Sequence, residues 1–269
     1  MEKIIKWTRE GPYMLLVGSG FVWGVVAVCM IVWTEADTVQ GEAYRIIYWH
    51  VPAAWWCLST YIGATVSSFL YLWRKNPLWD KISWSWVQIS FFWGVLTLIT
   101  GSLWGKTTWG VYWVWDARLT TIAGLVIILL GVFILRKQLD PAVQAKYSAF
   151  WVILGAWNIP LIKASVDWWN TLHQGSSITL TGSALYPSIL WTLLAATLAS
   201  GCFTLILFIC FLRQAILTDR VSILQNLWAT NPDLQMENTH QPIKKGVYWY
   251  LHWFTVLFMT LLVALKIYL

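Results

Sequence analysis

Charged residues are scarce in this chain. Asp, Glu, Lys and Arg together make up 11% of the 269 residues, whereas a soluble domain carries about a quarter. Apolar residues make up 58%, and the mean hydropathy is +0.61. The shortage of charge excludes an ordinary soluble protein and predicts a protein that crosses a membrane several times.

Cysteine is also scarce, and its few copies lack the spacing that chemistry would need. None of the four forms a C-x-x-C pair or the C-x-x-C-H motif that attaches haem covalently. All lie inside apolar runs, where cysteine behaves as a small hydrophobic residue: Cys29, Cys57, Cys202 and Cys210. We therefore expect neither a disulfide nor thiol chemistry.

A nucleotide-binding loop is missing as well. The nearest approach is GSLWGKT at 101–107, but Gly101 and Gly105 enclose only three residues, and a P-loop needs four after a buried strand. The chain is therefore not expected to hydrolyse a nucleotide. Its net charge of +6 does not imply a nucleic acid partner, because most Lys and Arg lie in short loops between apolar runs.

Long apolar runs dominate the sequence instead. A transmembrane helix needs about 20 apolar residues, and six runs approach or exceed this length: 14–34, 52–73, 84–104, 119–135, 147–166 and 187–212. They predict an all-α membrane protein, a bundle of six transmembrane helices over 1–212. A cytoplasmic linker is expected at 213–246. A further apolar helix, 247–269, either spans the membrane as a seventh helix or lies in the interface.

Lys and Arg are unevenly distributed between the two sides of this predicted bundle. Three precede the first run, three lie in each of the loops 74–81 and 136–146, and four follow the sixth run. The opposite side has only Arg45, Lys106, Arg118 and Lys163. The positive-inside rule then places the N-terminus in the cytoplasm and the loops 35–50, 105–118 and 167–186 outside. We expect a multi-pass protein of the bacterial inner membrane, in contact with lipid.

Two histidines fall on the outer face beside tryptophan. His50 stands in YRIIYWHVPAAWW just before the second run, with Pro52 expected in the first helical turn. His173 follows the fifth run, in DWWNTLHQGS. A single interfacial His is more often an ordinary surface residue. Two of them on one face predict a pair of axial ligands, which suits holding haem rather than activating oxygen.

Four of the 23 tryptophans lie within twelve residues: Trp104, Trp109, Trp113 and Trp115. Their indole faces suit stacking on a porphyrin, although tryptophan also forms interfacial belts in any membrane protein. The outer-face cations Arg45, Lys106 and Arg118 are candidates for the haem propionates. Asp116 is expected to pair with Arg118 or with an indole N–H. Further contacts to haem are expected from Trp49, Trp168 and Trp169.

These segments also carry a family resemblance. WGVYWVWDARLT resembles the tryptophan-rich WWD signature of haem-handling membrane proteins, and the two histidine motifs resemble those of the CcmC family. The resemblance covers about residues 40–215 in order and spacing. It implies a six-helix bundle that binds haem b transiently and without covalent bonds at the periplasmic face. His50 and His173 would be the axial ligands and 104–119 the platform.

The resemblance further implies partners. Haem would pass to a membrane-anchored haem chaperone of cytochrome c maturation. The chain would belong to a complex with the ATPase and permease of an ABC transporter and a small one-span subunit. It would be no enzyme itself. Two alternatives stay open: a quinone-linked redox protein that uses His50 and Asp116 in proton chemistry, and a structural transporter subunit without haem.

Overall fold

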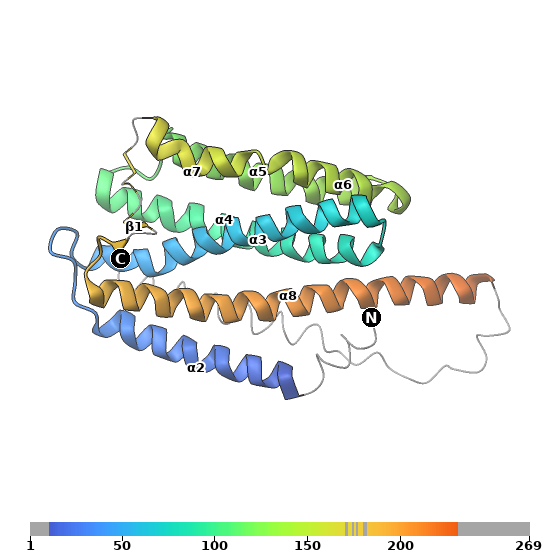
Figure 1. The fold of residues 1–269 in the computed structure, drawn as a ribbon, viewed down its shortest axis with the longest axis horizontal. Coiled ribbons are helices and arrows are strands. Elements are labelled where there is room, and N and C mark those ends of the chain that lie inside the picture. Colours follow the sequence, from blue (N-terminus) through green and yellow to red (C-terminus); the bar gives the residue numbers. More distant parts are fainter. Residues whose placement is uncertain (1–10, 170–171, 174, 176, 180–181, 231–269) are drawn as a thin grey trace. The chain divides into compact units, whose positions relative to one another are not determined.

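The computed structural model describes residues 11–169 and 182–230, together with 172–173, 175 and 177–179. The elements are α2 (Gly11–Trp33), the 3-10 helix η1 (Glu42–Ile46), α3 (Ile47–Arg74), α4 (Pro77–Trp109), α5 (Ala117–Gln138), α6 (Pro141–Gly155), α7 (Asn158–Trp168), β1 (Ile178–Thr179), β2 (Gly182–Ser183) and α8 (Pro187–Thr230). The two strands pair antiparallel, and all else regular is helical (Figure 1). The predicted all-α membrane protein is confirmed.

The chain divides into two compact units at Leu212, and the bundle discussed below ends there. The predicted linker, 213–246, begins inside α8, which stays helical to Thr230. Both the rest of that linker and the apolar run 247–269 lie outside the described residues.

Within the described part of the chain, five helices are long and apolar enough to cross a membrane: Met14–Trp33, Pro77–Trp109, Ala117–Gln138, Pro141–Val166 and Pro187–Leu227. The second predicted span, 52–73, lies in α3, which has 28 residues but is not one of these five. Six crossings therefore stay a prediction.

Small polar side chains are buried between α3 and α4. The hydroxyl groups of Ser68 and Ser83 are 2.8 Å apart, and Ser90 donates to the carbonyl of Cys57 at 2.9 Å. Small residues let two helix backbones approach closely, and hydrogen bonds satisfy their hydroxyl groups away from water. The closely packed α3–α4 pair is thus the centre of the bundle.

The fifth predicted span, 147–166, is interrupted by a short turn, although the two helices on either side together form the candidate span Pro141–Val166. It falls on α6 and α7, which are separated by a turn at Ala156 and Trp157. Pro160 explains the break, because proline has no N–H for the carbonyl four residues earlier and its ring crowds that carbonyl. Asn158 fixes the turn by donating from its side chain to the carbonyl of Thr121 in α5, at 2.7 Å.

α8 packs on α3 and α4 through tryptophan side chains. The indole N–H of Trp56 reaches the carbonyl of Thr197 at 3.2 Å, and that of Trp93 donates to the hydroxyl of Thr204 at 3.0 Å. The ring of Trp86 stacks on Phe208 with centroids 3.9 Å apart. These tryptophans therefore belong to helix packing rather than to an interfacial belt.

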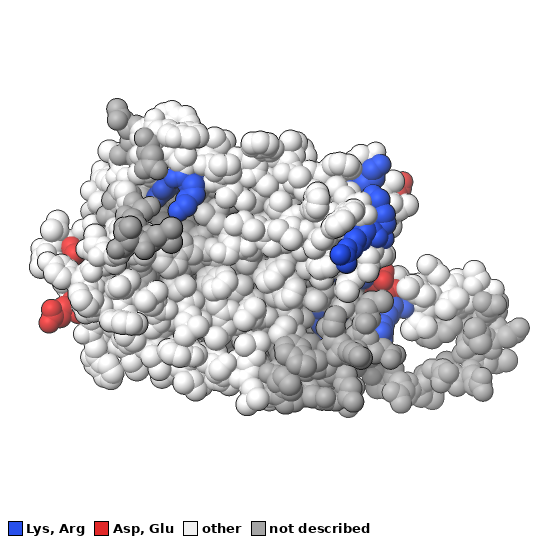
Figure 2. Space-filling model, in the orientation of Figure 1, with Lys and Arg blue, Asp and Glu red and all other residues white. Residues whose placement is uncertain are grey.

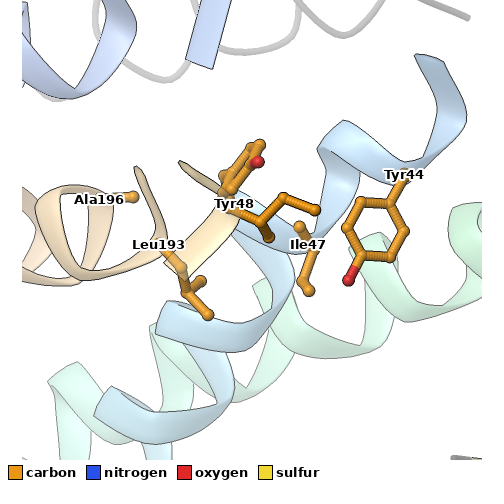
Figure 3. Packing of buried hydrophobic residues seen from close by; sticks show 6 residues of the cluster. Tyr44, Ile47, Tyr48, Leu193 and Ala196 are labelled. Atoms are coloured by element: carbon orange, nitrogen blue, oxygen red, sulfur yellow. The ribbon is translucent and has the colours of Figure 1, made fainter. Parts of the chain in front are cut away.

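A buried cluster joins η1 and the start of α3 to the start of α8. Its members are Tyr44, Ile47, Tyr48, Ile189, Leu193 and Ala196. Figure 3 shows the tyrosines and Ile47 of the first segment beside Leu193 and Ala196 of α8. Trp104 of α4 packs against this cluster from the side. The cluster therefore anchors the end of the bundle where the predicted site residues lie.

Candidate functional site

His50 lies within α3 rather than before it. The 3-10 helix η1 leads directly into α3, which begins at Ile47, so His50 is already in the first turns and Pro52 is inside the helix. The expectation that Pro52 would occupy the first turn was wrong, because η1 starts the helix several residues earlier. Trp49 and His50 are half-buried side chains at this end of α3.

The imidazole of His50 has one nitrogen held by α4. Its Nδ1 lies 3.0 Å from the hydroxyl oxygen of Thr100. Within the described part of the chain, no residue forms a hydrogen bond with Nε2 of the same ring. One ring nitrogen is thus held by a hydroxyl group of α4, and Nε2 is the nitrogen that could bind a metal.

A glycine allows this close approach between α3 and α4. A Cβ atom at Gly101 would lie only 3.0 Å from Cε1 of His50. Such contacts are tighter than normal packing, so a larger residue at 101 would push the ring of His50 away. The glycine that appeared to open a nucleotide-binding loop thus provides room for His50.

Trp104 forms a wall beside His50. Its ring meets the imidazole edge-on, with centroids 5.6 Å apart, and meets Tyr44 in the same way at 6.2 Å. Its indole N–H donates to the side-chain oxygen of Gln40 at 2.8 Å. Trp104 is therefore fixed from both sides, and it orients His50 from within the protein core.

Asp116 ties the tryptophan-rich segment to the loop that carries His173. It is buried, with 8% of its surface exposed, and is the N-cap of α5. One carboxylate oxygen accepts from the backbone N–H of Arg118 at 2.9 Å and the other from that of Leu172 at 3.0 Å. The predicted partnership with Arg118 thus includes its main chain, and the carboxylate holds the residue just before His173.

Arg118 and His173 complete the group. A guanidinium nitrogen of Arg118 lies 3.4 Å from Nδ1 of His173, and because a guanidinium only donates, Nδ1 is the acceptor. Both Arg118 and His173 interact electrostatically with His50. Two histidines that are 123 positions apart in the sequence are therefore brought to one end of the bundle, with a cation beside them.

The other two candidate cations are engaged in local contacts. Arg45 forms an ion pair with Glu42, holds the pKa of that exposed carboxyl below its usual range, and also donates to the carbonyl of Ile31. Lys106 donates to the carbonyl of Gly110 at 2.9 Å, and its ammonium group lies over the ring of Tyr112. Gly110 has a φ of +79° and ends α4, so Lys106 stabilises that helix end.

The remaining tryptophans differ in exposure. Trp109 still belongs to α4 and lies against Gly105, where an added Cβ would be 3.1 Å from its ring. Trp113 and Trp115 follow the helix and pack edge to face, 5.6 Å apart, with Trp115 83% exposed. Trp168 and Trp169 are exposed at the end of α7. The predicted segment 104–119 is thus part core and part open surface.

Three residues of the site were missed in the sequence: Thr100, Gly101 and Gln40. A ligand histidine needs an acceptor for its second ring nitrogen, so a search for hydroxyl groups near the outer end of the run 84–104 would have found Thr100. Nothing in the sequence indicates Gln40, because its contact with Trp104 joins positions 64 apart.

Comparison with known proteins identifies relatives of this chain. A family model described as "Heme exporter protein C" (CcmC) matches residues 2–227. A "Putative cytochrome c biosynthesis ccmC-like mitochondrial protein" of Marchantia polymorpha is 43% identical over 202 residues, 74% of this chain and 86% of the relative. "Heme exporter protein C" of Bradyrhizobium diazoefficiens is 38% identical over 196 residues, 72% of this chain and 74% of the relative.

The protein of the same name in Escherichia coli strain K12 is 35% identical over 204 residues. That match covers 75% of this chain and 80% of the relative. With most of the chain matched both by the family model and by these relatives, this protein belongs to the heme exporter protein C family.

Proposed function

We propose that this chain binds haem b, without covalent bonds, at the periplasmic face of the bacterial inner membrane during cytochrome c maturation. It then delivers the haem to a membrane-anchored haem chaperone. The names of the relatives refer to haem export and cytochrome c biosynthesis. The observation that carries the proposal is the gathering of His50, His173 and Arg118 at one end of the bundle.

The chemistry of these three residues fits haem as a cargo. Two imidazoles can occupy the two axial positions of haem iron, which leaves no open position for oxygen. Arg118 is the best placed of the candidate cations to receive a propionate, because it lies beside His173 and interacts with His50. Arg45 and Lys106 are already used in local contacts, so their part in binding propionates is smaller.

The exposed tryptophans support delivery. Trp115 and Trp168 are 83% and 66% exposed at the same end of the molecule, and indole rings contribute much to binding at protein contacts. Haem stacked on Trp113 and Trp115 would remain accessible to a second protein. We further propose the ABC transporter ATPase and permease and the small one-span subunit as partners of the chain, with ATP hydrolysis left to the ATPase.

The position of Asp116 weighs against the redox alternative. Both of its carboxylate oxygens accept backbone N–H groups. These bonds give the residue a structural task as a helix cap and loop tie, rather than the task of moving protons with His50.

The proposal is tested on the detergent-purified protein titrated with ferric and then ferrous haem. We expect a Soret band and the sharp visible bands of low-spin haem with two histidine ligands. A protein that remains colourless after reconstitution, or one that holds only high-spin haem, would overturn the proposed function.

Orientation is tested with single cysteines in a chain whose native cysteines are replaced by alanine. Gln138, the last residue of α5, and Gly175, which follows α7, are both exposed. We expect Gly175→Cys to react with a membrane-impermeant thiol reagent in intact cells, and Gln138→Cys only after permeabilisation. Lys and Arg gather at the end of the bundle where α3 ends and α4 begins, which agrees with this orientation (Figure 2). The reverse labelling pattern would place the histidines in the cytoplasm.

A further inference from the structure

We infer that Thr100 is the positioning residue that selects the tautomer of His50 and aims its Nε2 at haem iron. This inference rests on the proposed function. It concerns a buried hydroxyl group near the outer end of the predicted span 84–104, which contacts His50 rather than haem itself.

The direction of each hydrogen bond follows from the donors available. A threonine hydroxyl has one hydrogen, and the hydroxyl of Thr100 has two carbonyl acceptors within reach, Leu96 at 2.7 Å and Thr97 at 3.3 Å. The same oxygen lies 3.0 Å from Nδ1 of His50. With the hydroxyl hydrogen directed to the nearer carbonyl, the oxygen accepts from His50, and we assign the proton of the imidazole to Nδ1.

The position of the lone pair follows from this assignment. In a neutral imidazole one nitrogen carries the proton and the other has a lone pair. With the proton on Nδ1, the lone pair is on Nε2, the nitrogen that has no hydrogen-bond partner among the described residues.

The acceptor is held rigidly. Thr100 is completely buried, and its β-branched side chain has few rotamers in a helix. Gly101 allows the ring of His50 to approach α4, and Trp104 closes the other side at 5.6 Å. These three residues, which lie within little more than one turn of α4, therefore fix both the plane and the protonation of the imidazole.

The chemical nature of the acceptor affects how strongly His50 would hold haem. A hydrogen bond at the distal nitrogen of a ligand histidine raises the basicity of the ligand. A neutral hydroxyl forms a weaker bond than a carboxylate does, so Thr100 strengthens the iron bond moderately. Such a ligand holds haem and still releases it.

The test compares Thr100→Val, which keeps the shape and removes the acceptor, with Thr100→Ser, which keeps the acceptor. Thr60→Val is the matched control, since Thr60 is also buried in a helix and its hydroxyl also donates to the carbonyl four residues earlier, at 2.6 Å. Haem loss is measured by transfer to an excess of apomyoglobin, and the midpoint potential of bound haem by redox titration.

We expect Thr100→Val to lose haem about tenfold faster than the wild type. This is the lower end of the effect seen when a hydrogen-bond partner of a metal-binding histidine is removed. Its midpoint potential should become more positive, because a less basic imidazole stabilises ferric iron less. Thr100→Ser and Thr60→Val should behave as the wild type in both measurements. Equal rates and potentials for Thr100→Val and Thr60→Val would overturn the inference alone, while a wild type without histidine-ligated haem would overturn the proposed function with it.

Discussion

Replacement of both His50 and His173 by alanine is expected to abolish the low-spin haem spectrum. Each histidine comes from a different segment, and the structure brings both to one end of the bundle beside Arg118. Removal of an axial ligand should weaken haem retention strongly. The loss should exceed the roughly 10- to 100-fold that follows when only a hydrogen-bond partner of a ligand is removed. Each single variant should therefore keep weakly bound haem with one histidine ligand, and the double variant none. Absorption spectra of the reconstituted proteins measure this.

Two controls separate ligation from folding. His50→Gly leaves a gap next to Gly101, and added imidazole should restore the low-spin bands if His50 is a ligand. His240→Ala and His252→Ala change histidines outside the described residues and should keep the wild-type spectrum. Loss of haem in His240→Ala together with retention in His173→Ala would show that the ligand assignment is wrong.

Hydropathy was enough to predict most of the helices, because apolar runs of this length have few alternatives. It also predicted the helix α3 from the run 52–73, although α3 is not among the helices apolar enough to count as candidate spans. The break between α6 and α7 could have been predicted from Pro160, since an interior proline interrupts a helix. The start of α3 could not, because η1 joins it without a loop.

The site was predictable in its residue types but only partly in their tasks. The sequence placed both histidines and Arg118 on one face, where the structure brings them together. It could not separate Trp104, which packs against the core, from Trp115, which is 83% exposed. Both are aromatic residues of one segment, and only their neighbours distinguish them. The contacts of Thr100 and Gln40 depend on how α3, α4 and the preceding loop pack, which no local pattern encodes.

The end of the bundle opposite the histidines has an ion pair that should matter for stability. Arg136 at the end of α5 bonds to Asp80 in the first turn of α4, and both side chains are largely withdrawn from solvent, with 13% and 18% exposed. The guanidinium also lies 4.8 Å from the centre of the Trp84 ring. Each charge has the sign favoured at its helix end. The pair therefore joins the two helices whose other ends carry Trp104 and Arg118.

Arg136→Ala is expected to lower the free energy of unfolding by about 3 kcal/mol, because it leaves the largely buried carboxylate of Asp80 without its partner. Arg74→Ala is the matched control, since Arg74 is exposed and also lies over a tryptophan, 5.4 Å from the centre of the Trp73 ring. That change should cost less than about 1 kcal/mol. Denaturation of the purified proteins in mixed detergent measures both.

The double variant Asp80→Asn/Arg136→Gln should be more stable than Arg136→Ala, because a neutral pair leaves no buried charge. If Arg136→Ala unfolds no more easily than Arg74→Ala, the pair does not hold α4 and α5 together.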